Sequence, residues 1–117
     1  MLSLPPNVGI YLYSAPVDMR RSFDGLSVLV MDVLEQNPLS GSLFVFLNRS
    51  GDKLKLLYYD GQGLCLFYKR LERGRFYRPE AAVDGVELSS QQLRLLLDGL
   101  AISLANEAPK NGVEILA

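Results

Sequence analysis

The sequence contains no histidine and only one cysteine, and both absences restrict the chemistry open to it. Histidine is the commonest general base and the commonest metal ligand, so Ser-His-Asp and Cys-His catalytic sites are excluded. A lone cysteine without histidine cannot supply the ligands of a zinc site. Cys65 alternates with Leu64 and Leu66, which is typical of a small packed hydrophobic residue. These absences exclude histidine-dependent catalysis and a zinc site. Together with the carboxylate pattern described below, they lead us to expect no catalytic residue, no metal and no cofactor.

Long apolar runs are also missing. No stretch approaches the roughly 20 apolar residues that a membrane-spanning helix needs, and the N-terminus lacks the basic and apolar regions of a signal peptide. With the single cysteine, these features predict a cytoplasmic protein with no membrane partner. The chain has 117 residues, of which 49% are hydrophobic and 21% charged. We expect one domain over residues 1–105 and a frayed tail over residues 106–117.

The net charge of −1 conceals an uneven distribution. Residues 1–48 have a net charge of −2 and residues 80–117 a net charge of −4. Residues 49–79 carry eight basic and three acidic residues, a net charge of +5. The overall charge therefore says nothing about nucleic acid, whereas the central segment has a local positive field.

The central segment has the pattern of a β-hairpin. Two apolar, aromatic-rich runs flank the turn Asp60–Gly63, and their alternation favours strands over helices. Both runs become charged at the end away from the turn, and antiparallel pairing brings those two ends together. The basic residues expected at this open end are Lys53, Lys55, Lys69, Arg70 and Arg73.

The remaining pattern predicts an α+β fold. Leu43–Leu47 is a nearly continuous apolar strand, and a turn connects it to the hairpin, so Leu43–Leu71 is expected to form a three-stranded antiparallel meander. Val8–Tyr13 is expected to join the same sheet. Apolar residues at helical spacing predict a helix over Phe23–Gln36. We therefore predict an antiparallel sheet built on the meander, packed against one N-terminal helix, with a C-terminal helix.

The C-terminal half shows weaker signals. Ser89–Gln92 has the pattern of a capping box before an amphipathic helix of about twelve residues. Short strands are predicted at Arg75–Pro79, on the sheet edge, and at Val86–Leu88. The core residues expected to be buried together are Val30, Phe46, Leu56 and Leu66.

Four carboxylates occupy loops or the start of a helix: Asp18, Asp24, Asp52 and Asp60. Three or four carboxylates can hold a divalent metal for phosphoryl transfer, so a metal-dependent nuclease or transposase site is one interpretation. The sequence neighbours favour simpler roles, because Asp52 and Asp60 open turns and the other two lie where they can accept from amides near a helix start.

Basic residues interleaved with aromatic ones are the most distinctive feature of the chain. Cations neutralise phosphates, and exposed aromatic rings stack on bases, so this pattern predicts nucleic-acid binding. The alternative is a solvated, charged strand end with Phe76 and Tyr77 packed inward. The candidate nucleic-acid-binding residues are Lys53, Lys55, Lys69, Arg70, Arg73, Arg75 and Arg78.

Two long motif blocks, Asp18–Leu26 and Tyr68–Phe76, together with Leu43–Phe46 and Tyr58–Gly63, resemble a known family. The chain is similar over residues 4–100 to the TnpB accessory protein of the IS-sixty-six insertion-sequence family, the second open reading frame of those bacterial elements. The tail after Ala101 shows no such resemblance.

The resemblance implies a small protein that is encoded beside a separate transposase and needed for transposition, with no established catalytic activity. We expect the transposase of the same element as a partner, and insertion-sequence DNA is the second candidate partner. Our hypothesis is a non-enzymatic accessory protein that assists the transposase–DNA complex through the basic segment. A protein-interaction module that binds the transposase without touching DNA is the alternative. The candidate partner-binding residues are Asp18, Arg20 and Arg21.

Overall fold

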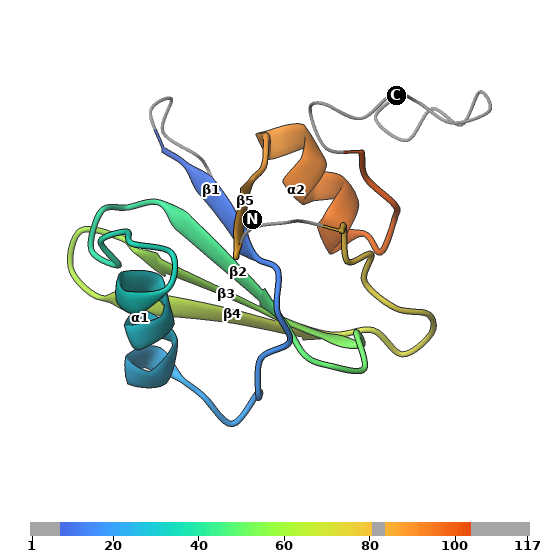
Figure 1. Cartoon of the computed structure of the whole chain (residues 1–117), viewed down its shortest axis with the longest axis horizontal. Coiled ribbons are helices and arrows are strands. Elements are labelled where there is room, and N and C mark those ends of the chain that lie inside the picture. The colour runs from blue at the N-terminus through green and yellow to red at the C-terminus, as the bar shows by residue number, and fades with distance from the viewer. Residues whose placement is uncertain (1–7, 81–83, 104–117) are drawn as a thin grey trace.

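A five-stranded sheet lies between two helices (Figure 1). The computed structural model describes residues 8–80 and 84–103. The elements in chain order are β1 (Ile10–Tyr13), α1 (Phe23–Asp32), β2 (Leu43–Leu47), β3 (Lys53–Tyr59), β4 (Leu64–Arg70), β5 (Gly85–Glu87) and α2 (Ser90–Leu97). Among these residues, no helix has the length and apolar content needed to cross a membrane. The predicted α+β class and two helices are confirmed.

The strand order is β4-β3-β2-β1-β5. β2, β3 and β4 pair antiparallel in sequence order, which confirms the predicted meander. The strand predicted at Val8–Tyr13 does join this sheet as β1, but it pairs parallel to β2. The expectation of a wholly antiparallel sheet was therefore wrong. The reason is the connection, because a chain that crosses over through α1 returns in the same direction.

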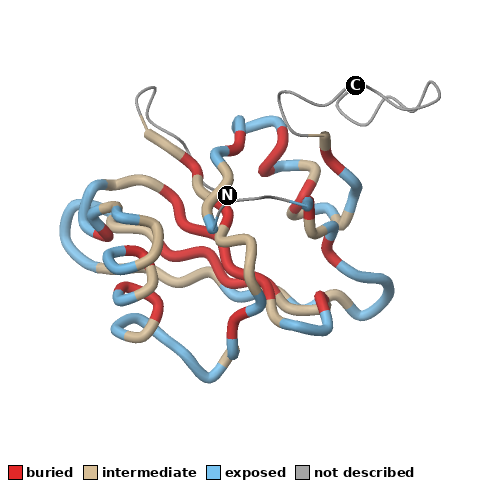
Figure 2. Tube along the Cα trace, viewed as in Figure 1, coloured by how far each residue is buried: buried red, intermediate tan, exposed pale blue. Residues whose placement is uncertain are grey.

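The two faces of the sheet have separate cores. The buried residues run along the central strands and recur in both helices (Figure 2). The α1 face buries Phe44, Phe46 and Leu57 against Leu26 and Val30 of the helix. The opposite face, which we call the α2 face, is packed against α2. Its buried residues include Leu43, Val45, Leu47, Leu54, Leu56, Leu93 and Leu96.

The predicted four-residue core was therefore wrong in one member. Val30 and Phe46 are buried together, and Leu66 packs against them partly buried. Leu56 is fully buried on the other face. Successive strand residues point to opposite faces, and β3 is covered on both, so Leu56 and Leu57 are buried in different cores.

Both helices are shorter than predicted. The helix expected over Phe23–Gln36 ends at Asp32. Glu35 takes a positive φ of 54°, and the Gln36 amide donates to the distant carbonyl of Val30, so the last turn widens and the chain leaves the helical path.

The C-terminal helix α2 has well-defined ends. Its capping box is confirmed, because the Ser89 hydroxyl accepts from the Gln92 amide and the Gln92 side chain accepts from the Ser89 amide. The helix stops after eight residues rather than about twelve. Gly99 has a positive φ of 76°, and the Leu100 amide returns to the Leu95 carbonyl, which is the hydrogen bonding of a Schellman motif.

The segment between β4 and β5 has no strand over the residues described. The edge strand predicted at Arg75–Pro79 was therefore wrong: Phe76 is buried, and its amide donates to the Gly51 carbonyl in the β2–β3 turn at 2.7 Å. The short strand predicted at Val86–Leu88 is confirmed as β5, one residue earlier. The tail predicted over residues 106–117 lies outside the described residues and stays a prediction.

Candidate functional site

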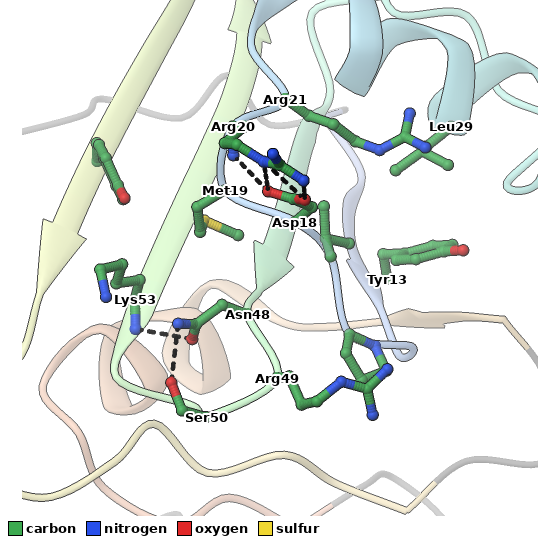
Figure 3. Close-up of a pocket in the computed structure, with 13 residues that line it drawn as sticks. Tyr13, Asp18, Met19, Arg20, Arg21, Leu29, Asn48, Arg49, Ser50 and Lys53 are labelled. Carbon is green, nitrogen blue, oxygen red and sulfur yellow. Dashed lines mark hydrogen bonds and ion pairs between the residues drawn. The ribbon is translucent and has the colours of Figure 1, made fainter.

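A groove of about 930 Å³ opens on the α1 face, and we call it the α1-face groove. It lies between the loop that follows β1 and the turn that joins β2 to β3 (Figure 3). Its lining residues are Tyr13, Pro16, Val17, Asp18, Met19, Arg20, Arg21, Leu29, Asn48, Arg49, Ser50, Lys53 and Tyr68.

The loop side of the groove is organised by Asp18. Its carboxylate accepts from the Arg20 backbone amide at 2.9 Å and from the Arg20 guanidinium at 2.6 Å (Figure 3). These bonds, with the guanidinium contact the larger contribution, lower the pKa of Asp18 from 3.8 to about 2. The carboxylate is therefore ionised at neutral pH, and it orients a guanidinium that is almost fully exposed.

A buried lysine holds this loop against the sheet. Lys55 on β3 is only 5% exposed, and its ammonium donates to the carbonyls of Met19 at 2.8 Å and Arg21 at 2.7 Å. The same ammonium lies 4.7 Å from the centre of the Tyr68 ring, within the range of a cation–π contact. Lys55 therefore fixes the main chain that carries Arg20 and Arg21, from below the groove.

The turn side is held by its own side chains. Asp52 accepts from the Asn48 amide at 2.7 Å, from the Ser50 hydroxyl at 2.8 Å and from the Lys53 ammonium at 3.3 Å. These bonds, led by the Asn48 contact, hold the pKa of Asp52 well below its ordinary value. These side chains hold the turn in shape, and Arg49 at its tip is exposed.

The α1-face groove is positively charged. Arg20, Arg21, Arg49 and Lys53 line it, and Asp18 is its one acidic lining residue. Tyr68 is 51% exposed, and with Tyr13 it supplies aromatic surface beside these cations. Cations at two rims and tyrosines in between are the features that attract phosphates and can accept an unpaired base.

Four of the seven predicted nucleic-acid-binding cations donate to main-chain carbonyls. Lys55 does so inside the α1 face, as described. Lys69 points to the α2 face and donates to the Leu97 carbonyl at the C-terminal end of α2, at 2.6 Å. There it satisfies a carbonyl that has no partner within the helix.

Arg75 and Arg78 hold the β2–β3 turn in place through hydrogen bonds to its main-chain carbonyls. Arg75 donates to the Ser50 carbonyl, and Arg78 donates to the carbonyls of Ser14 and Asn48. Burial, and secondly the nearby charge of Arg49, lower the pKa of Arg78. These contacts fix the position of the turn that carries Arg49.

Of the other three predicted cations, Lys53 is half-buried, and Arg70 and Arg73 are exposed. Lys53 is paired in register with Arg70 at the open end of the hairpin, as the sequence predicted. Arg70 forms an exposed ion pair with Glu72 at 3.0 Å, and Arg73 is exposed. Lys53 joins Asp18, Arg20 and Arg21 in one groove, so the structure brings part of both candidate sets together. Their roles in binding stay predictions.

Sequence reasoning missed Arg49 and Tyr13 as groove residues. Arg49 was interpreted only as part of a turn, although that turn adjoins the basic end of the hairpin and this was the available signal. Tyr13 reaches the groove because β1 pairs parallel to β2, a pairing that the sequence pattern did not reveal.

Three of the four loop carboxylates have the simpler of their two predicted roles, and Asp18 does so by accepting from the Arg20 backbone amide ahead of α1. Asp52 organises its turn, and Asp60 accepts from the amides of Gln62 and Gly63 at 2.9 Å, which lowers its pKa. Within the residues described, no group of three or more histidine, cysteine, aspartate or glutamate side chains is placed to hold a metal ion.

Comparison with known proteins identifies one family. The model of the family described as IS66 Orf2 like protein matches residues 8–107. Uncharacterized protein y4hO of Sinorhizobium fredii is 47% identical over 100 residues, covering 86% of this chain and 87% of that protein. Uncharacterized protein y4jC of the same organism is 37% identical over 91 residues, covering 78% of each. No solved structure matches.

Proposed function

Because the chain belongs to the IS66 Orf2-like family of insertion-sequence proteins, we propose that it is a non-enzymatic accessory protein of transposition that contacts insertion-sequence DNA through the α1-face groove. The contact is with the phosphate backbone. It positions the DNA for the transposase of the same element without reading base sequence, because phosphate contacts orient a complex and carry little sequence information.

One observation carries this proposal: cations from two separate segments converge on one open groove. Arg20 and Arg21 come from the loop after β1, and Arg49 and Lys53 come from the β2–β3 turn. Lys55 and Arg78 hold those two segments in place by donating to their main-chain carbonyls. Arg70 and Arg73 extend the basic surface from the neighbouring strand end. A pre-positioned basic surface of this kind binds phosphates with little ordering cost.

The test is the salt dependence of duplex binding, followed by fluorescence anisotropy. If about four to six cations reach phosphates, log affinity falls against log salt with a slope of roughly −4 to −5. Arg49→Ala is expected to weaken binding to all duplexes alike and to flatten the slope by about one unit. Arg94→Ala is the matched control, because Arg94 is an equally exposed arginine on the far helix α2, and it should leave the slope unchanged.

Arg70 and Arg73 are tested as a pair. Their double alanine variant is expected to fold normally and to flatten the slope by about two units. The protein-interaction module would replace this proposal under two conditions. The wild type would have to show no binding to DNA at low salt, and the double alanine variant would have to fail to capture the transposase in a pull-down. Magnesium- or manganese-dependent nicking of DNA that is lost in Asp18→Ala or Asp60→Ala would contradict the non-enzymatic role.

A further inference from the structure

The two edges of the sheet are unequal. β5 closes one edge with three residues, whereas β4 forms the other edge with seven. All seven residues of β4 pair with β3 in one uninterrupted register, without a bulge or a proline. Natural proteins protect exposed edges by shortening, bulges, proline, charged side chains or covering elements, and a long flat edge is a template for another strand. The charges of β4 are confined to its last two residues, Lys69 and Arg70.

The hydrogen bonds at the two ends of the β3–β4 ladder show which groups face outward. The Asp60 amide donates to the Gly63 carbonyl, and the Leu71 amide donates to the Asp52 carbonyl. Residues in an antiparallel ladder alternate between hydrogen-bonded and non-hydrogen-bonded pairs. Between these two ends, Cys65, Phe67 and Lys69 therefore bond inward to β3. The main-chain groups that point away from the sheet belong to Leu64, Leu66, Tyr68 and Arg70.

These outward amides and carbonyls have no hydrogen-bond partner in the part of the chain that the structure describes. Leu64 and Leu66 are also only partly buried, in contrast to the fully covered β2. We propose that the β4 edge pairs antiparallel with the β4 edge of a second copy of this chain. The paired edges form one continuous ten-stranded sheet.

The register of this pairing follows from the positions of the outward groups. If Leu66 lies opposite Tyr68 of the second copy, Leu64 lies opposite Arg70, and all four outward residues of each copy find a partner. The four pairs exchange about eight hydrogen bonds. A shift by two residues in either direction leaves an outward residue of each strand beyond the end of the other strand.

The side chains fit this register. On one face Tyr68 lies beside Leu66 of the second copy, and on the other face Phe67 lies beside its own counterpart, so aromatic and aliphatic pairs form at the centre. No like charges lie opposite one another. Antiparallel pairing also brings the basic end of one β4, with Arg70, next to the Asp60 turn of the other. This charge complementarity favours a second copy over an unrelated strand.

Such a dimer has its twofold axis perpendicular to the sheet, because residues on one face of each β4 meet residues on the same face of the other. Both α1-face grooves then open on the same side. On the basis of the function proposed above, the dimer offers two basic grooves to one DNA molecule. The pairing itself does not depend on that function, and its test uses no DNA.

Sedimentation of the full chain across a dilution series tests the pairing. The wild type is expected to be a dimer that dissociates on dilution. Leu66→Pro removes one outward amide, a position at which an edge strand tolerates proline, and it should give a folded monomer. Leu66→Ala loses the same side chain but keeps the amide, so it should remain dimeric. A wild type that stays monomeric at every concentration would overturn the proposal.

Cross-linking tests the register, in a Cys65→Ser background. Residue 67 meets its own counterpart in a non-hydrogen-bonded pair, with Cα atoms about 4.5 Å apart, which is within disulfide range. Phe67→Cys is therefore expected to give a covalent dimer on mild oxidation. Leu66→Cys is the control and should stay uncoupled. A covalent dimer through position 66 instead of 67 would refute the register.

Hydrogen exchange supplies a readout that needs no substitution. The amides of Leu64, Leu66, Tyr68 and Arg70 are expected to exchange slowly at high protein concentration and faster on dilution. Protection that persists in a monomer and disappears when residues 104–117 are removed would assign the edge to the chain's own tail and overturn the proposal. Protection that appears only after transposase is added would assign it to a strand of that protein, with the same consequence.

Discussion

Lys55 shows how a single residue links the sheet to the candidate site. Its ammonium is buried and donates to two main-chain carbonyls of the loop that carries Arg20 and Arg21. Among the described residues, the Lys55 ammonium forms no ion pair with a carboxylate. The charge is therefore compensated by carbonyl dipoles and by the face of Tyr68. Removing it would leave two carbonyls without their donor.

We predict that Lys55→Met lowers the free energy of unfolding by about 1–3 kcal/mol, because hydrogen bonds to a charged group are lost and two partly buried carbonyls lose their donor. Denaturant titration measures this loss. Arg73→Met is the control, since Arg73 is exposed, and it should change stability by less than about 0.5 kcal/mol. Equal changes in unfolding free energy for the two substitutions would show that Lys55 does not hold the loop against the sheet.

Asp18 makes stability depend on pH. The pKa of its carboxyl is about 2 in the folded protein and 3.8 in its ordinary state, because the Arg20 guanidinium and amide bind the ionised form. A lowered folded pKa gives stability that is present above pH 3.8 and is lost as the pH falls towards about 2. Asp18→Asn should therefore be less stable than the wild type at neutral pH, with the difference vanishing near pH 2.

Thermal unfolding of the two proteins across this pH range provides the measurement, and an NMR titration of the Asp18 carboxyl provides an independent one. A titration midpoint at or above 3.8 would contradict the geometry of the Asp18–Arg20 pair. Asp24→Asn is a suitable control, because Asp24 is an exposed carboxylate of the neighbouring helix.

At the scale of residues, the sequence identified a basic cluster but not the tasks of its members. Lys55 contacts main chain 34 and 36 positions earlier, and Lys69 contacts main chain 28 positions later. Such contacts depend on how distant segments pack, which neither charge counts nor strand alternation encode. The groove needed Arg49 as well, and only the fold brings it opposite Arg20 and Arg21.

At the scale of elements, the local patterns were the predictable part. Alternation, turn residues and the capping box located the three strands of the meander and the start of α2. The parallel partner of β1 was missed because pairing across a long connection leaves no mark on either strand. The five consecutive apolar residues of β2, all of which are buried in the structure, were the one local sign that both faces are covered.

Leu56 tests the two-core arrangement. Leu56→Ala is expected to cost about 2–5 kcal/mol, because the side chain is fully buried on the α2 face. Val30→Ala removes packing on the α1 face, so the losses of the double variant should add within about 0.5 kcal/mol. Coupling well above that value, measured by denaturant titration, would mean that the two side chains share one core.

Gly99 tests how α2 ends. Its φ of 76° is costly for other residues, and a Cβ atom at this position would meet only the Leu71 side chain at 3.5 Å, an ordinary contact. Gly99→Ala is therefore expected to lose about 1–2 kcal/mol of unfolding free energy through backbone conformation alone. Gly63→Ala is the control, since an added Cβ there has open space and no positive φ. Equal stability of both variants would refute this account.

At the scale of the whole molecule, the sheet separates two environments. The α1 face carries the basic groove, and the α2 face carries the packing of the C-terminal helix. Lys69 belongs to the second environment although it neighbours Tyr68 and Arg70 in sequence. The basic residues of segment 49–79 are consequently divided between the surface of the α1-face groove and contacts to main-chain carbonyls, a division that the net charge of the segment could not reveal.

The last described residues mark where the domain should end. Ile102 is 1% exposed, and the Gln92 side chain donates to the Ser103 carbonyl, so the chain is anchored to α2 at these positions. We predict that a chain ending at residue 105 has a free energy of unfolding within about 0.5 kcal/mol of that of the full protein. A chain ending at residue 101 loses both anchors and should be less stable by about 2–3 kcal/mol, since burial of an isoleucine side chain contributes about that much. Denaturant titration of the three chain lengths measures these differences. A large loss of unfolding free energy in the chain that ends at residue 105 would mean that the tail stabilises the fold. An unchanged unfolding free energy in the chain that ends at residue 101 would mean that Ile102 does not stabilise the core.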